Sequence, residues 1–491
     1  MRVDSHGSEA DFVSGVGGRL GAPKSRTYVD AVVALESRSN PVLARYTLVS
    51  DLAYVLSAME LGVTPEESGK ALLRCLLDLI PRAELLGREA AIGDVIVQRE
   101  VWVVGEVGAE TASWLHVGRN QGESLRAILP RMVFRDALHH EKIALAGLVR
   151  ALVDKAGPVI GSVAPFYHHM QHAGRTTLGE YLLSWAFSLH RHFEWLSQAD
   201  RHLDLAPPPN SGREVVVELI GRVGKRLGFS RQADLWQTLL NGEEQFSDAP
   251  FVFAQINVAM ARLSYDLLLW MTKEFDFFDL ADEHATASSG RPQKKNPFGF
   301  QTIISGAAVG AGRLAAQLST SVTMSEELNS TFHSYSLYQY AHDVIAWTDY
   351  MADVIAKGTF NLPELERKST LGFAGTREAL DVLVYEHKVP YRLAHHTLGA
   401  LVRSATAGAD QKAVREMLHA SLKEYPNVDL DELLQTMLAA STKNMQLNIK
   451  AFRRTHETLD RSLRVLEAAR GSNPVEAAVE RLMEESRRAI A

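Results

Sequence analysis

The chain is poor in cysteine: Cys75 is the only one among its 491 residues. An intrachain disulfide is therefore excluded, which fits a reducing compartment such as the cytoplasm. The chain also lacks any uncharged apolar run of about 18 residues, so we expect no membrane span. Residues 1–26 contain no long apolar segment either. We predict neither a signal peptide nor a membrane anchor there.

Blocks of like charge are also missing, and the formal net charge of -7 is mild for this length. Attraction to nucleic acid or to a membrane surface is therefore not indicated. No internal repeat is evident. The composition is 46% hydrophobic, enough for a large core. Above roughly 250–300 residues single cores usually divide, so we expect two or three domains.

Helical periodicity dominates what is present. Apolar side chains recur at 3.6-residue spacing over residues 178–196, and residues 207–212 end that pattern as a proline-rich loop. A second long helix is predicted to begin at Pro297, since proline suits the first helical turn. Its glycine-rich stretch 306–312 indicates a buried bundle helix that neighbours approach closely. A kinked or broken helix is the alternative.

Two further helices are predicted, one over residues 334–357 with Gly358 as its stop, and one over residues 430–470. Only short stretches such as residues 215–220 look like strands. The sequence therefore predicts a mainly α protein. Its helices are so long that one subunit alone could hardly cover them.

A long polar loop interrupts the helices at residues 282–296, and it contains almost nothing that could pack. Loops of this kind inside a compact helical chain are usually functional or disordered. Ser288, Ser289 and Gly290 give it flexibility. Its positive charges, which would suit a dicarboxylate, come from Arg291, Lys294 and Lys295.

Residues 165–173 form a histidine-rich stretch that reads Pro-Phe-Tyr-His-His-Met-Gln-His-Ala. One interpretation is a cluster of histidines at a helix end. A metal site is another, because His168 and His172 are four residues apart and could share a helix face. No companion Glu or Cys pattern is present, so metal ligation is not favoured.

A third stretch, residues 115–124, reads Leu-His-Val-Gly-Arg-Asn-Gln-Gly-Glu-Ser. Its residues alone are typical of a loop before a helix, with solvated polar groups. A fourth, residues 373–395, contains Thr376 as a plausible N-cap and Glu378 in the first turn of the helix that follows.

These stretches resemble the motifs of the argininosuccinate lyase, fumarase and aspartase superfamily. The polar loop is similar to Gly-Ser-Ser-x-x-Pro-x-Lys-x-Asn-Pro, and the histidine stretch to Pro-Gly-Tyr-Thr-His-Leu-Gln-x-Ala. The third stretch is similar to Leu-His-Thr-Gly-Arg-Ser-Arg-Asn-Asp-Gln in its first half only. Residues 373–395 resemble the carboxy-terminal domain of argininosuccinate lyases. The resemblance runs from about residue 30 to beyond residue 400.

The resemblance implies a three-domain lyase with a long central helical bundle, whose 20-helix core forms in a homotetramer. Each active site would then be built from three subunits. We expect an N-terminal helical domain over residues 1–113, the bundle domain over residues 114–363, and a C-terminal helical domain over residues 364–491. The expected partner is a small dicarboxylate, and no cofactor or metal is expected.

The resemblance also implies the chemistry. Ser288, as an alkoxide, would remove a proton from the carbon next to a carboxylate, and fumarate would leave. Lys294 would favour the ionised serine, and His169 would orient the carboxylate or help protonate the leaving group. The residues expected to bind substrate are Asn296, Ser289, Gln171, His168, Arg119, Asn120, His116, Arg291 and Arg175.

Several positions depart from the family patterns. Ala287 replaces a glycine, Arg291 a methionine, His168 a threonine, and residues 174–175 a Gln-Pro pair. The Gln-Glu-Asp-Lys-Glu segment that helps bind the arginine half of argininosuccinate has no counterpart in residues 325–332. The pocket for the leaving group therefore looks rebuilt, and we infer that argininosuccinate itself is not the substrate.

Four functional interpretations follow from these departures. The first is a lyase that releases fumarate and an amine from an N-succinyl amine, including adducts of diamines. The second is a nitrosuccinate lyase that releases nitrite, with Arg175 and Arg291 facing the nitro group. The third is argininosuccinate lyase proper, and the fourth is a crystallin-like homologue without activity.

Overall fold

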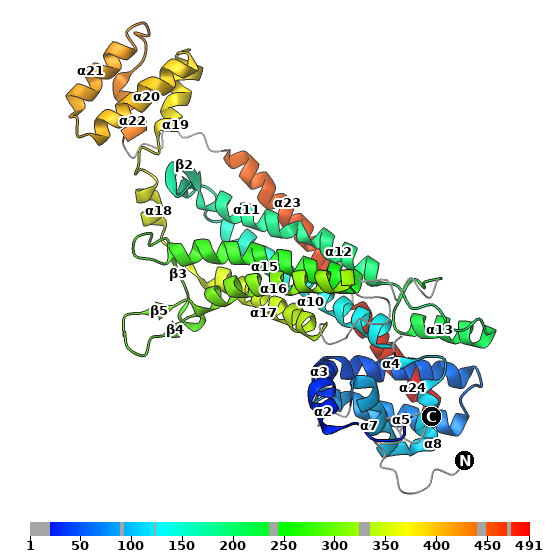
Figure 1. The fold of residues 1–491 in the computed structure, drawn as a ribbon. Helices are drawn as coiled ribbons and strands as arrows, with labels where there is room; N and C mark the ends of the chain where they lie inside the picture. The colour runs from blue at the N-terminus through cyan, green and yellow to red at the C-terminus, as the bar shows by residue number, and fades with distance from the viewer. Residues whose placement is uncertain are drawn as a thin grey trace.

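The computed structural model describes residues 20–88, 93–121, 124–234, 244–323, 334–438, 448–468 and 473–491. In these residues the chain is mainly α-helical, which confirms the predicted fold class (Figure 1). Long helices lie side by side in an elongated bundle. A compact group of N-terminal helices lies at one end of the bundle and a small C-terminal group at the other.

The N-terminal group comprises α2 (Arg26–Tyr28), α3 (Ala34–Glu36), α4 (Asn40–Glu60), α5 (Glu66–Leu79), α6 (Ala83–Leu86), α7 (Val95–Val107) and α8 (Ala109–Ala112). Asp94 caps α7, because its carboxylate accepts from the backbone N–H groups of Ile96 and Val97. The stretch Arg26–Glu60 is long and apolar enough to cross a membrane by length and composition alone. However, 83% of its apolar window is buried inside the protein, as in a core helix.

The bundle consists of α10 (Leu129–Ala156), α11 (Leu178–His190), α12 (His192–Leu203), α15 (Glu244–Trp270), α16 (Phe298–Thr323) and α17 (Ser334–Lys357). Helix α10 packs against α17 and α11, and α15 packs against α16. The helix predicted from Pro297 and the helix predicted over residues 334–357 are both confirmed. The periodic stretch 178–196 spans two helices, because the chain turns at Arg191.

The glycines of α16 allow it to pack closely on the aromatic side chains of α17. A Cβ at Gly299 would lie 2.2 Å from Tyr350 Oη. A Cβ at Gly306 would lie 2.3 Å from the Trp347 ring, and a Cβ at Gly310 would lie 2.0 Å from the Tyr340 ring. These positions therefore exclude any larger residue. The small residues act as predicted, and the described helix continues through the stretch without a break.

Three antiparallel strand pairs complete the central part. Strand β1 (Val163–His168) pairs with β2 (Gln171–Thr177), β3 (Phe278–Asp279) with β6 (Thr359–Phe360), and β4 (Thr286–Ala287) with β5 (Lys295–Asn296). Each pair is short and lies outside the bundle (Figure 1). Two of the three carry residues that the sequence motifs single out.

The strand predicted over residues 215–220 is wrong, because this segment lies in α13 (Glu214–Arg226). Leu219, Ile220 and Val223 are buried, whereas Val215 and Val217 are 40% and 45% exposed. The apolar residues therefore follow helical spacing with one buried face.

The single helix predicted over residues 430–470 is also wrong. The structure has α22 (Leu430–Leu438) and α23 (Ile449–Ala468), and the backbone at Asn448 is not helical. The Asn448 side chain accepts from the backbone N–H of Ala451, which caps a new helix. Residues 439–447 lie outside the described part of the chain.

The C-terminal region divides differently from the predicted domain of residues 364–491. A separate core contains residues between Ala379 and Met437, from α19 (Thr376–Asp381), α20 (Tyr391–Thr406), α21 (Gln411–Ser421) and α22. Helices α23 and α24 (Pro474–Ile490) instead contribute to the main core. The chain thus returns along the bundle, and α24 packs on α4 and α5 (Figure 1).

The predicted N-cap at Thr376 is wrong as well. Thr376 is the first residue of α19, Gly375 occupies the cap position, and the Thr376 hydroxyl donates to the carbonyl of Phe373. Glu378 lies in the first turn, as predicted. The short helix α18 (Leu362–Lys368) leads from the bundle into this C-terminal core.

Candidate functional site

The polar loop forms the tip of a hairpin that projects from the side of the bundle (Figure 1). Strands β4 and β5 close the hairpin, with Thr286 opposite Asn296 and Ala287 opposite Lys295. We call residues 286–296 the signature hairpin. Most of its residues are exposed, and Ser288, Asn296 and Lys295 are half-buried. Because its ladder is so short, contacts at the base of the hairpin determine its position.

Ser288 lies directly after β4, at the start of the loop. Its Oγ accepts a hydrogen bond of 3.2 Å from the backbone N–H of Arg291, and the Arg291 carbonyl accepts from the backbone N–H of Lys294 at 3.0 Å. The loop thus folds back on itself and aims an amide dipole at the serine oxygen. Such a dipole favours a negatively charged oxygen. The side chains of Arg291, Lys294 and Ser289 are exposed.

The base of the signature hairpin is fixed by ion pairs and by the helix α17. Lys295 Nζ lies 3.2 Å from Asp279 Oδ1 and 2.9 Å from Asp282 Oδ1, and these carboxylates raise the pKa of Lys295 against the effect of its burial. On the other side, His284 Nε2 lies 2.8 Å from Asp353 Oδ2 on α17. Hydrogen bonds from Lys357 and then from His284 lower the pKa of Asp353, which is therefore a carboxylate.

The histidine-rich stretch forms a β-hairpin, which corrects the interpretation as a helix end. His168 pairs with Gln171 across a two-residue turn, and the two turn residues, His169 and Met170, have φ of 53° and 59°. Left-handed backbone at both turn positions is typical of tight hairpin turns, yet glycine or asparagine normally supplies it. Non-glycine residues held in this conformation are concentrated at functional sites.

The turn places His169 at the exposed tip of the hairpin, with its ring centroid 4.2 Å from that of His168. His172 lies on the opposite strand, where its ring packs against Tyr167 at 4.7 Å. The alternative in which His168 and His172 share a helix face is therefore wrong, since both lie on β-strands. Gln171 is exposed, and its side-chain amide donates to the Met170 carbonyl at 3.3 Å.

Arg175 has a different environment from the one expected. Its guanidinium donates to the carbonyl of Thr436 on α22 at 3.3 Å, and a Cβ on Gly375 would lie 2.4 Å from the same group. Arg175 therefore docks the C-terminal core onto the base of the β1–β2 hairpin. This contact does not support the expected role of Arg175 opposite a nitro group.

The third motif lies at the N-terminal end of the molecule. Arg119 is 7% exposed, forms an ion pair with Asp51, and stacks 4.1 Å from the centroid of the Tyr54 ring. Within one chain these contacts hold Arg119 on α4, and its expected contact with substrate stays a prediction. His116 Nε2 lies 2.8 Å from Glu100 Oε2, and Asn120 is exposed.

The three motifs are far apart within one chain. The β1–β2 hairpin, the signature hairpin and the segment after α8 occupy three separate places in the ribbon (Figure 1). Residues 325–332, where a leaving-group segment was sought, lie outside the described residues. One chain alone therefore does not bring Ser288, His169 and Asn120 together.

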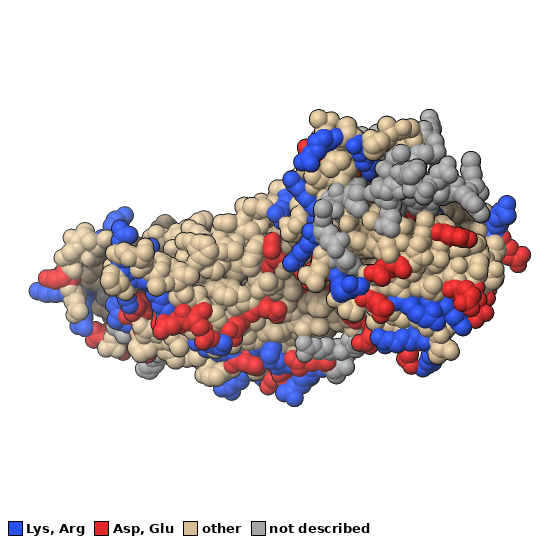
Figure 2. Space-filling model, turned by 90° about the horizontal axis from the view of Figure 1, so that it is seen from below, with Lys and Arg blue, Asp and Glu red and all other residues tan. Residues whose placement is uncertain are grey.

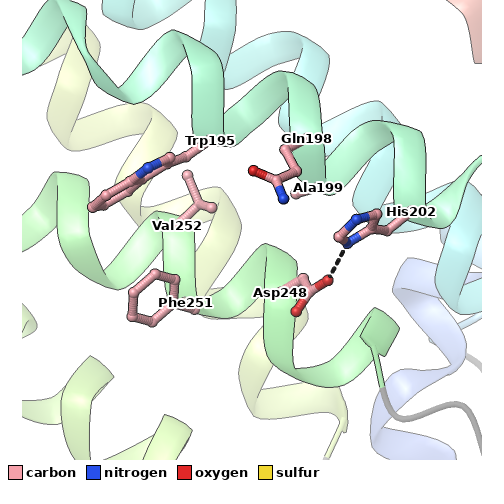
Figure 3. A pocket seen from close by; sticks show the side chains of 7 residues that line it. All are labelled: Trp195, Gln198, Ala199, His202, Asp248, Phe251 and Val252. Atoms are coloured by element: carbon pink, nitrogen blue, oxygen red, sulfur yellow. Dashed lines mark hydrogen bonds and ion pairs between the residues drawn. The ribbon is translucent and has the colours of Figure 1, made fainter.

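A cavity of about 340 Å³ lies between α12 and α15 (Figure 3). In its lining, His202 Nδ1 lies 2.7 Å from Asp248 Oδ2. The cavity is lined by Trp195, Gln198, Ala199, His202, Asp248, Phe251 and Val252. None of the motif residues lines this cavity. We therefore place the candidate site at the motifs and not in this pocket.

One cluster has the composition of a metal site. Possible ligand atoms of Glu283, His284 and Asp353 all lie within 4.8 Å of one another. However, the Lys357 ammonium donates to both Glu283 and Asp353, so a side chain already balances their charge. His284 was not singled out from the sequence, and only its position four residues before Ser288 could have drawn attention to it.

Comparison with known proteins finds similarity to lyases. A family model described as Lyase matches residues 88–312. An argininosuccinate lyase of Methanoculleus marisnigri is 27% identical over 421 residues, which cover 82% of this chain and 84% of that relative. An argininosuccinate lyase of Clavibacter michiganensis subsp. michiganensis is 28% identical over 374 residues, which cover 74% of each chain.

Solved structures agree in fold. EDDS lyase in complex with formate superposes with a TM-score of 0.79 at 19% identity, covering 99% of this chain and 96% of that chain. A fumarate lyase from Mesorhizobium sp. BNC1 superposes with a TM-score of 0.66 at 14% identity, covering 89% of this chain and 96% of that chain. The fold is thus that of a lyase with a long helical bundle. Over most of its length the chain is similar in sequence to argininosuccinate lyases.

Proposed function

We propose that this protein is a carbon–nitrogen lyase that splits an N-substituted aspartate into fumarate and an amine, or catalyses the reverse addition. The observation that carries the proposal is the signature hairpin, which presents Ser288 with the Arg291 amide on its Oγ. The relatives named argininosuccinate lyase support the reaction class. The similarity in fold to EDDS lyase is consistent with that class.

The reaction begins with the loss of a weakly acidic proton from the carbon next to one carboxylate. Ser288 as an alkoxide takes this proton, the electron pair forms the new double bond, and the bond from the adjacent carbon to nitrogen breaks. A hydroxyl is a poor base at its ordinary pKa, so its ionised form needs stabilisation. The Arg291 amide and the Lys294 ammonium provide it.

The remaining residues bind the two carboxylates and the leaving amine. Asn296 and Lys294 hold the carboxylate where negative charge develops, and His169 orients the substrate or protonates the amine. Closure of the signature hairpin over the substrate excludes water. Arg119 supports the third motif from within the core, and Asn120 is the exposed residue next to it that would contact substrate.

We propose that the site is completed by other copies of the chain. Exposed apolar residues follow one stripe of α15 at seven-residue spacing, namely Phe251, Val258 and Tyr265, which are 41%, 41% and 56% exposed. A seven-residue apolar repeat is the pattern of helices that pack on partner helices. Figure 2 shows a broad uncharged surface along the elongated part of the molecule, with charged side chains along its lower edge.

The leaving group is expected to be an amine other than the arginine of argininosuccinate. The Arg175 guanidinium donates to a backbone carbonyl, which does not support its expected role opposite a nitro group. The side chain of Arg291 is exposed at the hairpin tip. A carboxylate on the amine, as in adducts of amino acids, would suit that cation.

The test uses the reverse reaction. The full-length protein is incubated with fumarate and a panel of amines, diamines, amino acids, ureido compounds and nitrite, and adducts are identified by mass. We expect an adduct with an amine, absent with Ser288→Ala and present at the wild-type rate with Ser421→Ala, an exposed serine on α21. A nitrite adduct would replace the amine proposal, and an adduct that forms without Ser288 would overturn the mechanism.

A further inference from the structure

The signature hairpin has one buried anchor that no motif includes. His284 lies in the short 3-10 helix Asp282–His284, four residues before Ser288, and its side chain is 8% exposed. Its Nε2 lies 2.8 Å from Asp353 Oδ2 on α17. Because Asp353 is a carboxylate, the Nε2–H of the imidazole donates in this contact.

Two further contacts bind the same residue to α17. Tyr350 Oη donates to the His284 carbonyl at 3.2 Å, and the two rings meet edge to face with centroids 5.5 Å apart. Tyr350 fits here only because Gly299 has no side chain, since a Cβ there would lie 2.2 Å from Tyr350 Oη. His284, which precedes the signature loop, and Gly299, which follows it, thus both lie against Tyr350.

The other anchor at the base of the hairpin is weaker. Lys295 pairs with Asp279 and Asp282, whose side chains are 71% and 98% exposed. Ion pairs of exposed carboxylates contribute little in water. The His284–Asp353 contact has one buried partner and a charged acceptor, which makes a hydrogen bond stronger. It is therefore the contact that fixes where the hairpin leaves the bundle.

We propose that His284 is a positioning residue of the lyase. It holds the signature hairpin on α17 through Asp353, which keeps Ser288 in its position relative to the substrate. The proposal rests on the proposed function for its catalytic consequence but not for its structural one. Loss of the contact releases the base of the hairpin, and a displacement of about 1 Å at a reacting group can cost about 100-fold in rate.

The variants separate the hydrogen bond from the ring. His284→Phe keeps a ring of similar size and loses the donor, whereas His284→Gln keeps an amide N–H near the position of Nε2. Asp353→Leu removes the acceptor from the other side. His419→Phe, at an exposed position of α21, is the matched control.

Hydrogen–deuterium exchange of the full-length protein tests the proposal without any substrate. We expect the peptide covering residues 285–297 to exchange at least about tenfold faster in His284→Phe and Asp353→Leu than in wild type. His284→Gln should restore most of the protection, and the double variant His284→Phe/Asp353→Leu should be no worse than either single one. Wild-type exchange in His284→Phe would overturn the inference whatever the enzyme does.

Turnover of the amine identified in the fumarate assay supplies the second readout. His284→Phe is expected to lower kcat at least about tenfold with KM within about twofold, because the base is misplaced while the carboxylate contacts remain. His284→Gln should recover kcat, and a merely structural role would not give this split. If wild type forms no adduct, the proposed function fails, and the exchange experiment still decides the role of His284.

Discussion

Glu141 on α10 is buried completely in the bundle, and its protonation should control stability. Its Oε1 lies 2.9 Å from Thr348 Oγ1 on α17, and its Oε2 has no hydrogen-bond partner within the described structure. Thr348 Oγ1 also lies 2.9 Å from the Val344 carbonyl, and one hydroxyl proton serves only one of these acceptors. Burial therefore raises the pKa of Glu141 to about 8.

The sign of the pH effect follows from this raised pKa. The folded protein keeps a proton on Glu141 between pH 4.5 and about 8, whereas the unfolded chain loses it. This contribution to stability is therefore fully present below pH 4.5 and is lost as the pH rises through about 8. Each pH unit in the window costs about 1.4 kcal/mol, so the complete loss is about 3–5 kcal/mol.

Glu141→Gln keeps the shape and removes the ionisation. At pH 5 the variant should match wild type in thermal unfolding, and at pH 9 it should unfold several degrees higher. The expected shift in Tm is the free-energy difference divided by the unfolding entropy, which is about 2 cal/mol/K per residue, or about 1 kcal/mol/K for this chain. Glu457→Gln, at an exposed position of α23, is the control. Equal differences in Tm between variant and wild type at pH 5 and pH 9 would show that the ionisation of Glu141 does not control stability.

Three further predictions concern packing, assembly and the shared site. Gly310→Ala places a methyl group 2.0 Å from an aromatic ring of α17 and should destabilise by about 1–3 kcal/mol in thermal unfolding, whereas Gly399→Ala, with open space around it, should be neutral or stabilising. Val258→Lys should lower the oligomeric state in light scattering, and an unchanged mass would exclude the α15 stripe as an interface. Mixing Ser288→Ala with His169→Ala after co-refolding should restore part of the turnover that each lacks, and no recovery would contradict a site shared between chains.

The sequence predicted the parts of the fold that local signals determine. Pro297 and Gly358 mark the start of α16 and the end of α17, and the glycines of α16 indicated close packing. Val215 and Val217 favoured a strand by their β-branched side chains, yet the buried face at helical spacing prevailed. Asn448 carried an N-cap signal that the periodicity of residues 430–470 concealed.

The candidate site was predicted less completely. The loop with Ser288 could be found because a long polar segment interrupts a helical chain. The left-handed turn at His169 could not, because neither turn residue is glycine or asparagine. The sequence also does not reveal that Arg119 pairs with Asp51 or that Arg175 donates to the Thr436 carbonyl, because these partners are far away along the chain.

The central claim is that Ser288 is the base of a fumarate-forming lyase. The most direct test measures the initial rate of addition to fumarate in deuterium oxide, with the amine that the panel identifies, for wild type, Ser288→Ala and Ser421→Ala. We expect one deuterium in the product, on the carbon from which Ser288 removes a proton in the elimination direction. We also expect a rate at least about 100-fold lower in Ser288→Ala alone. A Ser288→Ala protein that forms the same adduct at the wild-type rate would contradict it.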